Sequence, residues 1–238
     1  MFLSLKKIKY SVIIKLASDT LLAIKTVGLW SVGKLYISTF IDRFLDSNNK
    51  YDVIESLDPR ETIPNHPSVT HATIYVPTRA RPFLKLLNSL DLNKSETVFV
   101  DFGCGKGRAL LLAADFGIKN IKGIEFCNKL SAIAVINTKK YLNQSSAIKI
   151  EIINTDMSVY EVDPSDNLFY FYNPCDEFIL KKVIKNIIHS LSLNSKMGTI
   201  IYQNNTINYP IFFNEFSELS YLFCRDFSGN KFFVFKIN

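Results

Sequence analysis

The sequence of 238 residues lacks the cysteine pairs, histidine clusters and long apolar runs that mark several common classes of protein. Its four cysteines, Cys104, Cys127, Cys175 and Cys224, lie far apart, and no histidine is spaced to complete a zinc site. Neither a disulfide framework nor a metal site is therefore expected, and the thiols indicate a reducing cytoplasm. No Ser-His-Asp or Cys-His spacing typical of a nucleophilic enzyme stands out either.

Uninterrupted apolar stretches are also short. Near the N-terminus, charged residues interrupt the apolar ones at positions 15, 19, 25 and 34, before any stretch reaches the roughly 18 to 20 residues that span a bilayer. We therefore expect no transmembrane helix. A signal peptide is not expected either, because Lys15 breaks the apolar stretch and no small-residue cleavage site follows it.

Charge is unevenly distributed along the chain. The formal net charge is +6, and residues 1–50 alone carry eight basic and three acidic side chains, an excess of five. The nearly neutral remainder argues against a basic groove that follows a nucleic-acid backbone. Apolar spacing predicts helices in residues 2–46. Two interpretations of them stay open: packing against a domain, or peripheral contact of residues 1–50 with an anionic membrane surface.

Three prolines within residues 57–67 predict an irregular connector. We therefore expect a helical extension and linker over residues 1–70 and a catalytic domain over residues 71–238. From residue 75 onward, strand-like and helix-like segments alternate, which predicts a mostly parallel sheet with helices on both faces. Strands are expected over residues 97–101, 121–125, 148–153, 168–172, 199–203, 221–227 and 231–237, and helices over 83–90, 106–116, 127–141 and 177–191. Only residues 228–230 join the last two strands, which predicts an antiparallel hairpin.

Glycine is scarce, with nine residues in the chain, yet Gly103, Gly105 and Gly107 fall within five residues. They lie where a predicted strand meets a predicted helix, which is where ligands bind in an open α/β sheet. A tight turn without a ligand is the alternative. Dinucleotide-binding loops have the spacing Gly-x-Gly-x-x-Gly, whereas this loop has Gly-x-Gly-x-Gly, and Asp101 would put negative charge beside phosphates. Asp101 instead suits a ligand with a cationic end.

The segment Val98-Phe-Val-Asp-Phe-Gly-Cys-Gly-Lys-Gly-Arg108 resembles motif I of class I S-adenosylmethionine-dependent methyltransferases. The resemblance implies their Rossmann-like three-layer α/β sandwich, with a seven-stranded, mostly parallel sheet whose last strand is antiparallel. It also implies S-adenosylmethionine as the cofactor, with Asp101 near its sulfonium and ammonium end, directly or through water. The cofactor-binding loop then consists of Gly103, Cys104, Gly105 and Gly107.

Two further acidic residues follow the pattern of this family. Glu125 ends the second predicted strand, where the family has a carboxylate that accepts hydrogen bonds from both ribose hydroxyls. The alternative is a surface glutamate that caps the next helix. Asp156 follows the third strand, where the family's pattern implies a partner for the adenine amino group, with Met157 or a neighbour packed on the ring. A plain turn would favour an aspartate there equally well.

Two segments indicate where a methyl acceptor binds. Asn173-Pro174 follows the fourth strand at the position of the family's substrate-facing motif, so the Asn173 side chain is a candidate to hold an acceptor N–H. Cys175 departs from the second proline of the amino-methylating pattern, and a simple Asn-Pro turn is the alternative. Upstream, Tyr75-Val-Pro-Thr78 resembles a segment of non-SET protein lysine methyltransferases, which implies that Tyr75 and Thr78 contact the methionine moiety and that Tyr75 faces the acceptor. A plain entry into the next helix, with Pro82 at its first position, is the alternative.

The resemblance spans roughly residues 72–175 and predicts methyl transfer to an amine, with a protein lysine as the first candidate acceptor. Three alternatives stay open: a small-molecule N- or O-methyltransferase, a non-catalytic module that binds S-adenosylmethionine, and a membrane-surface protein in which the N-terminal helices carry the function. A nucleic-acid acceptor is disfavoured by the charge distribution. The expected location is the cytoplasm, with or without peripheral membrane contact.

Overall fold

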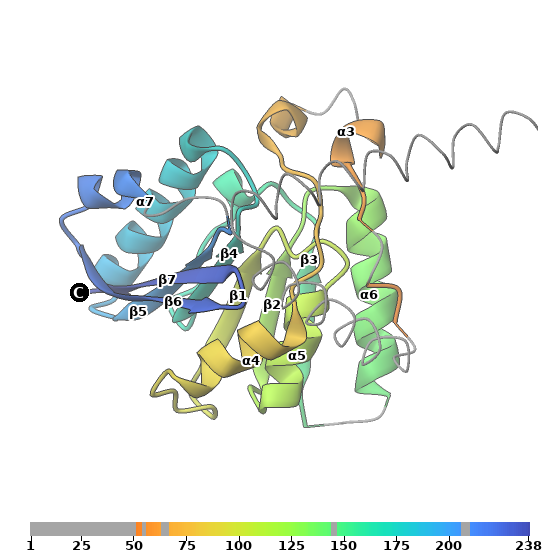
Figure 1. Ribbon diagram of the computed structural model, residues 1–238, viewed down its shortest axis with the longest axis horizontal. Helices are drawn as coiled ribbons and strands as arrows, with labels where there is room; N and C mark the ends of the chain where they lie inside the picture. Colours follow the sequence, from red (N-terminus) through yellow and green to blue (C-terminus); the bar gives the residue numbers. More distant parts are fainter. Residues whose placement is uncertain (1–50, 54–55, 63–66, 144–146, 206–209) are drawn as a thin grey trace, which may run out of the picture. The chain divides into compact units, whose positions relative to one another are not determined.

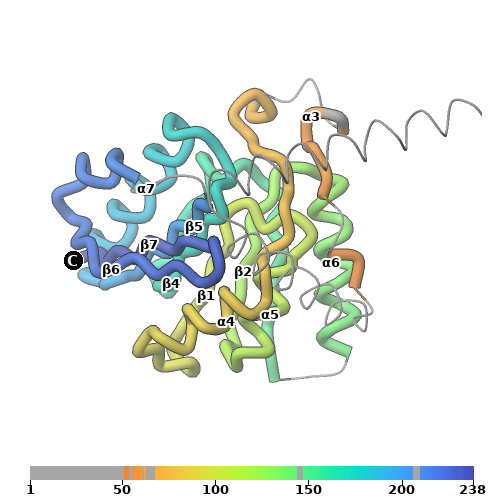
Figure 2. The backbone as a smooth tube through the Cα atoms, in the orientation of Figure 1, coloured from red at the N-terminus to blue at the C-terminus, as the bar shows by residue number. Residues whose placement is uncertain are grey.

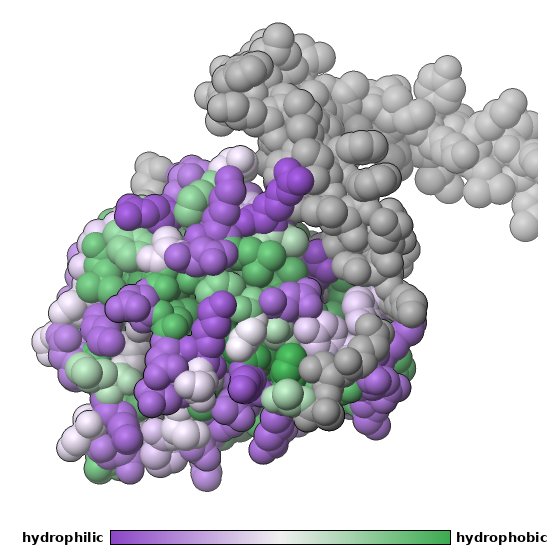
Figure 3. Space-filling view, turned by 90° about the horizontal axis from the view of Figure 1, so that it is seen from below, coloured by the Kyte–Doolittle hydropathy of each residue, from purple (hydrophilic) through white to green (hydrophobic). Residues whose placement is uncertain are grey.

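The computed structural model describes residues 51–238 except 54–55, 63–66, 144–146 and 206–209. The helices expected in residues 2–46, and the membrane contact expected for residues 1–50, lie outside the described residues. Among the helices that are described, none combines the length and the apolar character needed to cross a membrane. On the face seen in Figure 3, hydrophobic side chains gather among hydrophilic ones instead of covering the face.

Seven strands form one sheet (Figure 1). They are β1 (Val98–Phe102), β2 (Asn120–Ile124), β3 (Lys149–Ile153), β4 (Leu168–Tyr172), β5 (Gly198–Gln203), β6 (Leu219–Phe227) and β7 (Asn230–Ile237). Their order is β3-β2-β1-β4-β5-β7-β6, with β7 antiparallel to both of its neighbours and all other pairs parallel. The predicted mostly parallel sheet with a closing antiparallel hairpin is therefore confirmed.

Helices cover both faces of this sheet (Figure 1). One face packs against α4 (Ala80–Asn88), α5 (Arg108–Phe116) and α6 (Asn128–Leu142). The other packs against α7 (Glu177–Leu193), together with the short 3-10 helices η2 (Met157–Val159) and η3 (Ile211–Glu215). Two short elements, α3 (Pro59–Thr62) and η1 (Pro67–His71), precede α4. The result is the three-layer sandwich that the sequence predicts.

The central strands β1 and β4 are mostly apolar, as expected for strands whose two faces are both covered. All five residues of β1 are buried, and the only charged one among them is Asp101. The sheet therefore carries Asp101 into the interior near the carboxyl end of β1, at the edge where ligands bind in this architecture.

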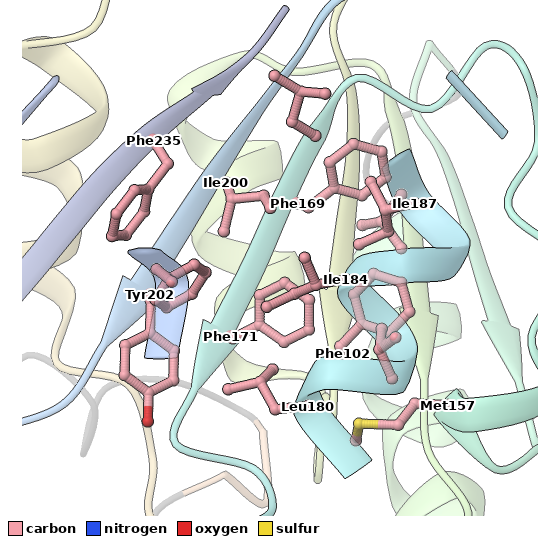
Figure 4. Packing of buried hydrophobic residues seen from close by; sticks show 14 of the residues in the cluster. Phe102, Met157, Phe169, Phe171, Leu180, Ile184, Ile187, Ile200, Tyr202 and Phe235 are labelled. Carbon is pink, nitrogen blue, oxygen red and sulfur yellow. The ribbon is translucent and has the colours of Figure 1, made fainter. Parts of the chain in front are cut away.

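Aromatic rings fill the layer between the sheet and α7 (Figure 4). The rings of Phe102 in β1 and Phe171 in β4 stack with centroids 4.8 Å apart and planes only 5° from parallel. Ile184 and Leu180 of α7 belong to the same buried cluster. This packing fixes the carboxyl ends of β1 and β4, which lead into the candidate site.

The start of α4 differs from the prediction. The helix begins at Ala80, so Pro82 occupies its third position, and the expectation that Pro82 is the first helical residue is wrong. The physical reason is that the first four N–H groups of any helix lack a helical partner, so a proline is accommodated throughout the first turn. Pro82 is buried there.

Phe171→Ala tests the core beneath the site. Phe171 is fully buried, and removal of a buried phenylalanine ring typically costs about 3–5 kcal/mol of stability. We expect a loss of that size in the free energy of urea-induced unfolding. Phe178→Ala is the matched control, because the Phe178 side chain is 58% exposed and its removal should change stability by less than about 1 kcal/mol. Equal losses in the two variants would contradict this account of the core.

Candidate functional site

A glycine loop connects β1 to α5. Gly103, Gly105 and Gly107 all have positive φ angles, of 83°, 56° and 83°, which a residue with a Cβ adopts only at a cost. Space is restricted as well: a Cβ on Gly103 would lie 2.7 Å from Cβ of Pro174, and one on Gly105 would lie 2.0 Å from Cδ2 of Tyr75. The loop is therefore a cradle of bare backbone.

Two buried carboxyl groups lie beside this loop. Asp101 is 3% exposed and Glu125 is 4% exposed. Glu125 Oε2 accepts a hydrogen bond from the Gly105 N–H at 2.9 Å, and Oε1 accepts one from the Cys127 N–H at 2.8 Å. Burial raises the pKa of Glu125 to about 7, although these backbone donors oppose the rise. The backbone N–H of Phe126 also interacts with this carboxylate, which has about four acceptor sites in all, so at least one site remains for a ligand.

The Asp101 carboxyl group has no hydrogen bond or ion pair within the described part of the chain. Burial, and then the nearby charge of Glu125, raise its pKa well above the ordinary range. Ionisation of both carboxyl groups is therefore unfavourable without a ligand. A cationic group beside Asp101 would favour its ionised form, and the expected role of Asp101 at the cationic end of a ligand stays a prediction.

Both carboxyl groups line one pocket, which we call the first pocket. It includes about 570 Å³ of space, counting the part open to solvent. Seven of the ten residues expected from the sequence lie on its wall: Tyr75, Thr78, Asp101, Gly103, Cys104, Gly105 and Glu125. The fold thus brings together residues that are up to 50 positions apart.

Residues 72–78 form a strap across this pocket, drawn in orange in Figure 2 between η1 and α4. The Tyr75 ring covers Gly105, and its hydroxyl donates to the Val53 carbonyl at 2.9 Å. At the other end of the strap, the Thr78 hydroxyl lies 3.3 Å from the Tyr170 hydroxyl. The strap therefore shields the glycine loop from solvent.

Cys104 lies on the pocket wall but is not placed for chemistry. Burial raises the pKa of its thiol well above the usual value, and the charges of Asp101 and Glu125 raise it further. The thiol packs beneath β2, close to Gly123. Cys104 thus supplies a small side chain for the turn, and its backbone N–H donates to the Ile124 carbonyl at 3.0 Å.

Three expected residues lie away from the first pocket. Gly107 is the residue before α5 and packs against Ala134 of α6. The Asp156 carboxylate caps η2 by accepting from the Ser158 N–H at 2.7 Å, and it also accepts from the Ser68 hydroxyl. It lines an adjoining pocket that shares Met157 and Phe126 with the first.

The third of these, Asn173, lies on a second pocket that borders the first. Asn204, Asn205 and Arg60 line this second pocket as well, while Tyr172 and part of the strap belong to both pockets. The Asn173 side-chain oxygen accepts from the Tyr202 hydroxyl at 3.1 Å and from the Asn204 amide at 2.9 Å. Asn173 therefore holds its neighbours in place at this pocket.

The residue-by-residue expectations missed two basic residues of the glycine loop. Arg108 lies on the wall of the first pocket, where its Nε donates to the Thr78 carbonyl at 3.4 Å. Lys106 is 3% exposed, and its Nζ lies 2.7 Å from Asp52 Oδ1. The sequence did contain a signal for these two residues, because Lys106 and Arg108 stand at the start of an apolar helical segment. No signal identifies Asp52, which is 54 positions from its partner.

Gly105→Ala tests the cradle. The added methyl group would overlap the Tyr75 ring, so we expect a loss of about 1–3 kcal/mol in the free energy of unfolding. Gly117→Ala is the matched control, because Gly117 also has a positive φ of 104° but faces only the flexible Lys94 side chain at 3.5 Å. An equal loss of unfolding free energy in Gly105→Ala and Gly117→Ala would contradict the close contact between Gly105 and the Tyr75 ring.

Comparisons with known proteins agree with this geometry. The model of the family "Histone methylation protein DOT1" matches residues 57–169, which include the strap, the glycine loop and both carboxyl groups. No curated protein sequence matches the chain.

Solved structures share the fold. An RNA methyltransferase from Salinibacter ruber, in complex with S-adenosylhomocysteine, is 18% identical with a TM-score of 0.50 and covers 68% of this chain and 94% of its own. The putative methyltransferase YhhF from Escherichia coli is 17% identical with a TM-score of 0.50, with coverages of 68% and 86%. Together, the fold, the family match and the pocket support an S-adenosylmethionine-dependent methyltransferase.

Proposed function

We propose that this methyltransferase transfers its methyl group to an amine, with the side-chain amine of a protein lysine as the first candidate acceptor. The observation that carries the proposal is the first pocket itself, in which a strap, a glycine loop and two buried carboxyl groups adjoin a second pocket. The match of residues 57–169 to a histone methylation family supports a protein acceptor. A small-molecule N- or O-methyltransferase is the alternative.

The residues on the wall suit the parts of S-adenosylmethionine. Asp101 has the charge to hold the ammonium and sulfonium end, and Glu125 has lone pairs for the ribose hydroxyls. The bare backbone of Gly103 and Gly105 allows close approach, and Arg108 has the charge to hold the methionine carboxylate. For adenine we propose Met157 as the packing surface, with Asp156 as the amine acceptor.

Bound there, S-adenosylmethionine supplies a methyl group activated by its sulfonium. The chain's contribution is to hold the acceptor nitrogen in line with that methyl group and to keep water out, which lowers the entropic part of the barrier. Tyr75 and the rest of the strap exclude water from one side. On the acceptor side, Asn173 acts by holding Asn204 and Tyr202.

Calorimetry and label transfer test the proposal. Wild-type protein is titrated with S-adenosylhomocysteine, and we expect Asp101→Asn to weaken binding about tenfold or more, because a charge-assisted contact is lost. Radiolabelled S-adenosylmethionine is then incubated with protein, metabolite and nucleic-acid fractions of a lysate. Label in the protein fraction supports the proposal, and label in metabolites alone favours the small-molecule alternative. Binding without any transfer would favour a non-catalytic module.

The affinity for S-adenosylhomocysteine should depend on the ionisation of Glu125. Only the ionised carboxylate accepts from both ribose hydroxyls, and its pKa of about 7 lies above the ordinary 4.5. Binding should therefore weaken as the pH falls below about 7, approaching tenfold per pH unit. The free energy of unfolding changes with pH in the opposite direction. A carboxyl group whose pKa is raised in the folded protein stabilises the fold below its pKa in the unfolded chain, and this stabilisation is lost as the pH rises through about 7. Glu125→Gln should bind weakly and lose the part of the pH dependence centred near pH 7, while any dependence due to Asp101 remains. An unchanged profile in that variant would contradict this role of Glu125.

A further inference from the structure

Lys106 is a buried cation in the middle of the glycine loop. Its side chain is only 4% exposed, and it stands between Gly105 and Gly107, which both have positive φ angles. Its Nζ atom lies 2.7 Å from Asp52 Oδ1, and its ammonium group has no other hydrogen bond or ion pair within the described part of the chain. Because a buried charge without a partner is costly, the position of Lys106 depends on Asp52.

Asn137 of α6 closes a ring of contacts around this pair. Its Oδ1 atom accepts from the Asp52 N–H at 3.1 Å, and its Nδ2 group donates to the carbonyls of Asp52 and Lys106, both at 3.0 Å. Asn137 is only 2% exposed, so water has little access to compete for these bonds. The backbone of Asp52 is thereby held to α6 and its carboxylate to the glycine loop. We call Asp52, Lys106 and Asn137 the clamp.

The residue after Asp52 is connected to the same loop through the strap. Val53 is fully buried, and its carbonyl accepts from the Tyr75 hydroxyl at 2.9 Å. The Tyr75 ring covers Gly105 so closely that a Cβ there would lie 2.0 Å from Cδ2 of the ring. Two consecutive residues of the chain therefore fix Lys106 directly and the cover of its neighbour Gly105 through Tyr75.

We propose that the clamp is a positioning device for the cofactor, in which Asp52 and Asn137 hold the glycine loop in the conformation that binds S-adenosylmethionine. This inference rests on the proposed function, because it takes the first pocket as the cofactor site. None of the three clamp residues lines that pocket. They are therefore positioning residues, which act through the backbone of the loop and do not touch the cofactor.

A loop with three glycines needs such an anchor. Glycine allows the backbone many conformations of similar energy, whereas the cradle requires the one in which the Gly105 N–H donates to Glu125. A protein that spends only a fraction of its time in the binding conformation has an apparent dissociation constant that is larger by the inverse of that fraction. Loss of the clamp should thus weaken cofactor binding although no contact to the cofactor is removed.

Wild-type protein provides a test that requires no variant to fold. Linkage is reciprocal, so a clamp that favours cofactor binding must itself be favoured by the bound cofactor. We expect saturation with S-adenosylhomocysteine to slow hydrogen exchange of the Asp52 N–H, which donates to Asn137, about threefold or more. The Gly229 N–H is the control, because it donates to Asp226 Oδ1 at 2.8 Å in the turn between β6 and β7, and its exchange should not change.

Calorimetry on variants tests the ion pair. Asp52→Asn should raise the dissociation constant for S-adenosylhomocysteine about fivefold or more, and Asp52→Glu, which retains the charge, should keep most of the affinity. Glu215→Gln is the matched control. The Glu215 side chain is 57% exposed against 58% for Asp52, and it pairs with Lys181 at 2.6 Å. The same change of charge there should leave the affinity unchanged.

Lys106→Met separates positioning from a general loss of stability. This variant should bind S-adenosylhomocysteine as weakly as Asp52→Asn, and the bound ligand should no longer slow exchange of the Asp52 N–H. Because Asp52 has lost its partner in the loop, adding Asp52→Asn to Lys106→Met should cause no further loss of affinity. Losses that multiply in the double variant would mean that the two residues act independently and would overturn the inference.

Two further results would overturn it: wild-type exchange at Asp52 that does not slow, or slows no more than at Gly229, and an affinity of Asp52→Asn equal to that of the wild type. Failure of the wild type to bind S-adenosylhomocysteine is a different result. It would remove the proposed function, and this inference with it. Normal binding with no change at Asp52 would remove the inference alone.

Discussion

The carboxylate of Glu125 is the contact on which the rest of the site depends. Its two oxygens accept from the N–H groups of Gly105 and Cys127, so one side chain joins the loop after β1 to the loop after β2. These bonds keep the glycine loop open as a cradle, while burial holds the pKa of the carboxyl at about 7. The proposed contact with the ribose would therefore link the shape of the loop to ligand affinity through one ionisable group.

The strap depends in turn on that loop and on the segment before it. Tyr75 lies over Gly105, donates its N–H to the Leu57 carbonyl and donates its hydroxyl to the Val53 carbonyl. Residues before position 71 thus contribute to the surroundings of the pocket. The boundary between an extension over residues 1–70 and a catalytic domain over residues 71–238 stays a prediction.

The residues that the sequence located best are close to one another along the chain or lie at the ends of adjacent strands. Asp101, Gly103 and Gly105 belong to one motif, and Glu125 ends the neighbouring strand, so the strand-to-helix pattern brings them together. Asp156 and Asn173 follow strands in the same way, but their side chains bond to local partners, Ser158 in one case and Asn204 in the other. The pattern locates the loop but not the direction in which the side chain points. Their roles in binding remain proposals.

The sequence by itself determined the class of fold and the chemistry of the cofactor, because buried strands, glycine turns and a short hairpin are properties of neighbouring residues. Only the tertiary structure decided that β7 lies between β5 and β6, that Asp52 pairs with Lys106, and that the buried Nη1 atom of Arg79 has no acceptor in the described part of the chain. Each of these depends on segments far apart in the chain. Such contacts are set by packing and burial, which no local pattern of residues encodes.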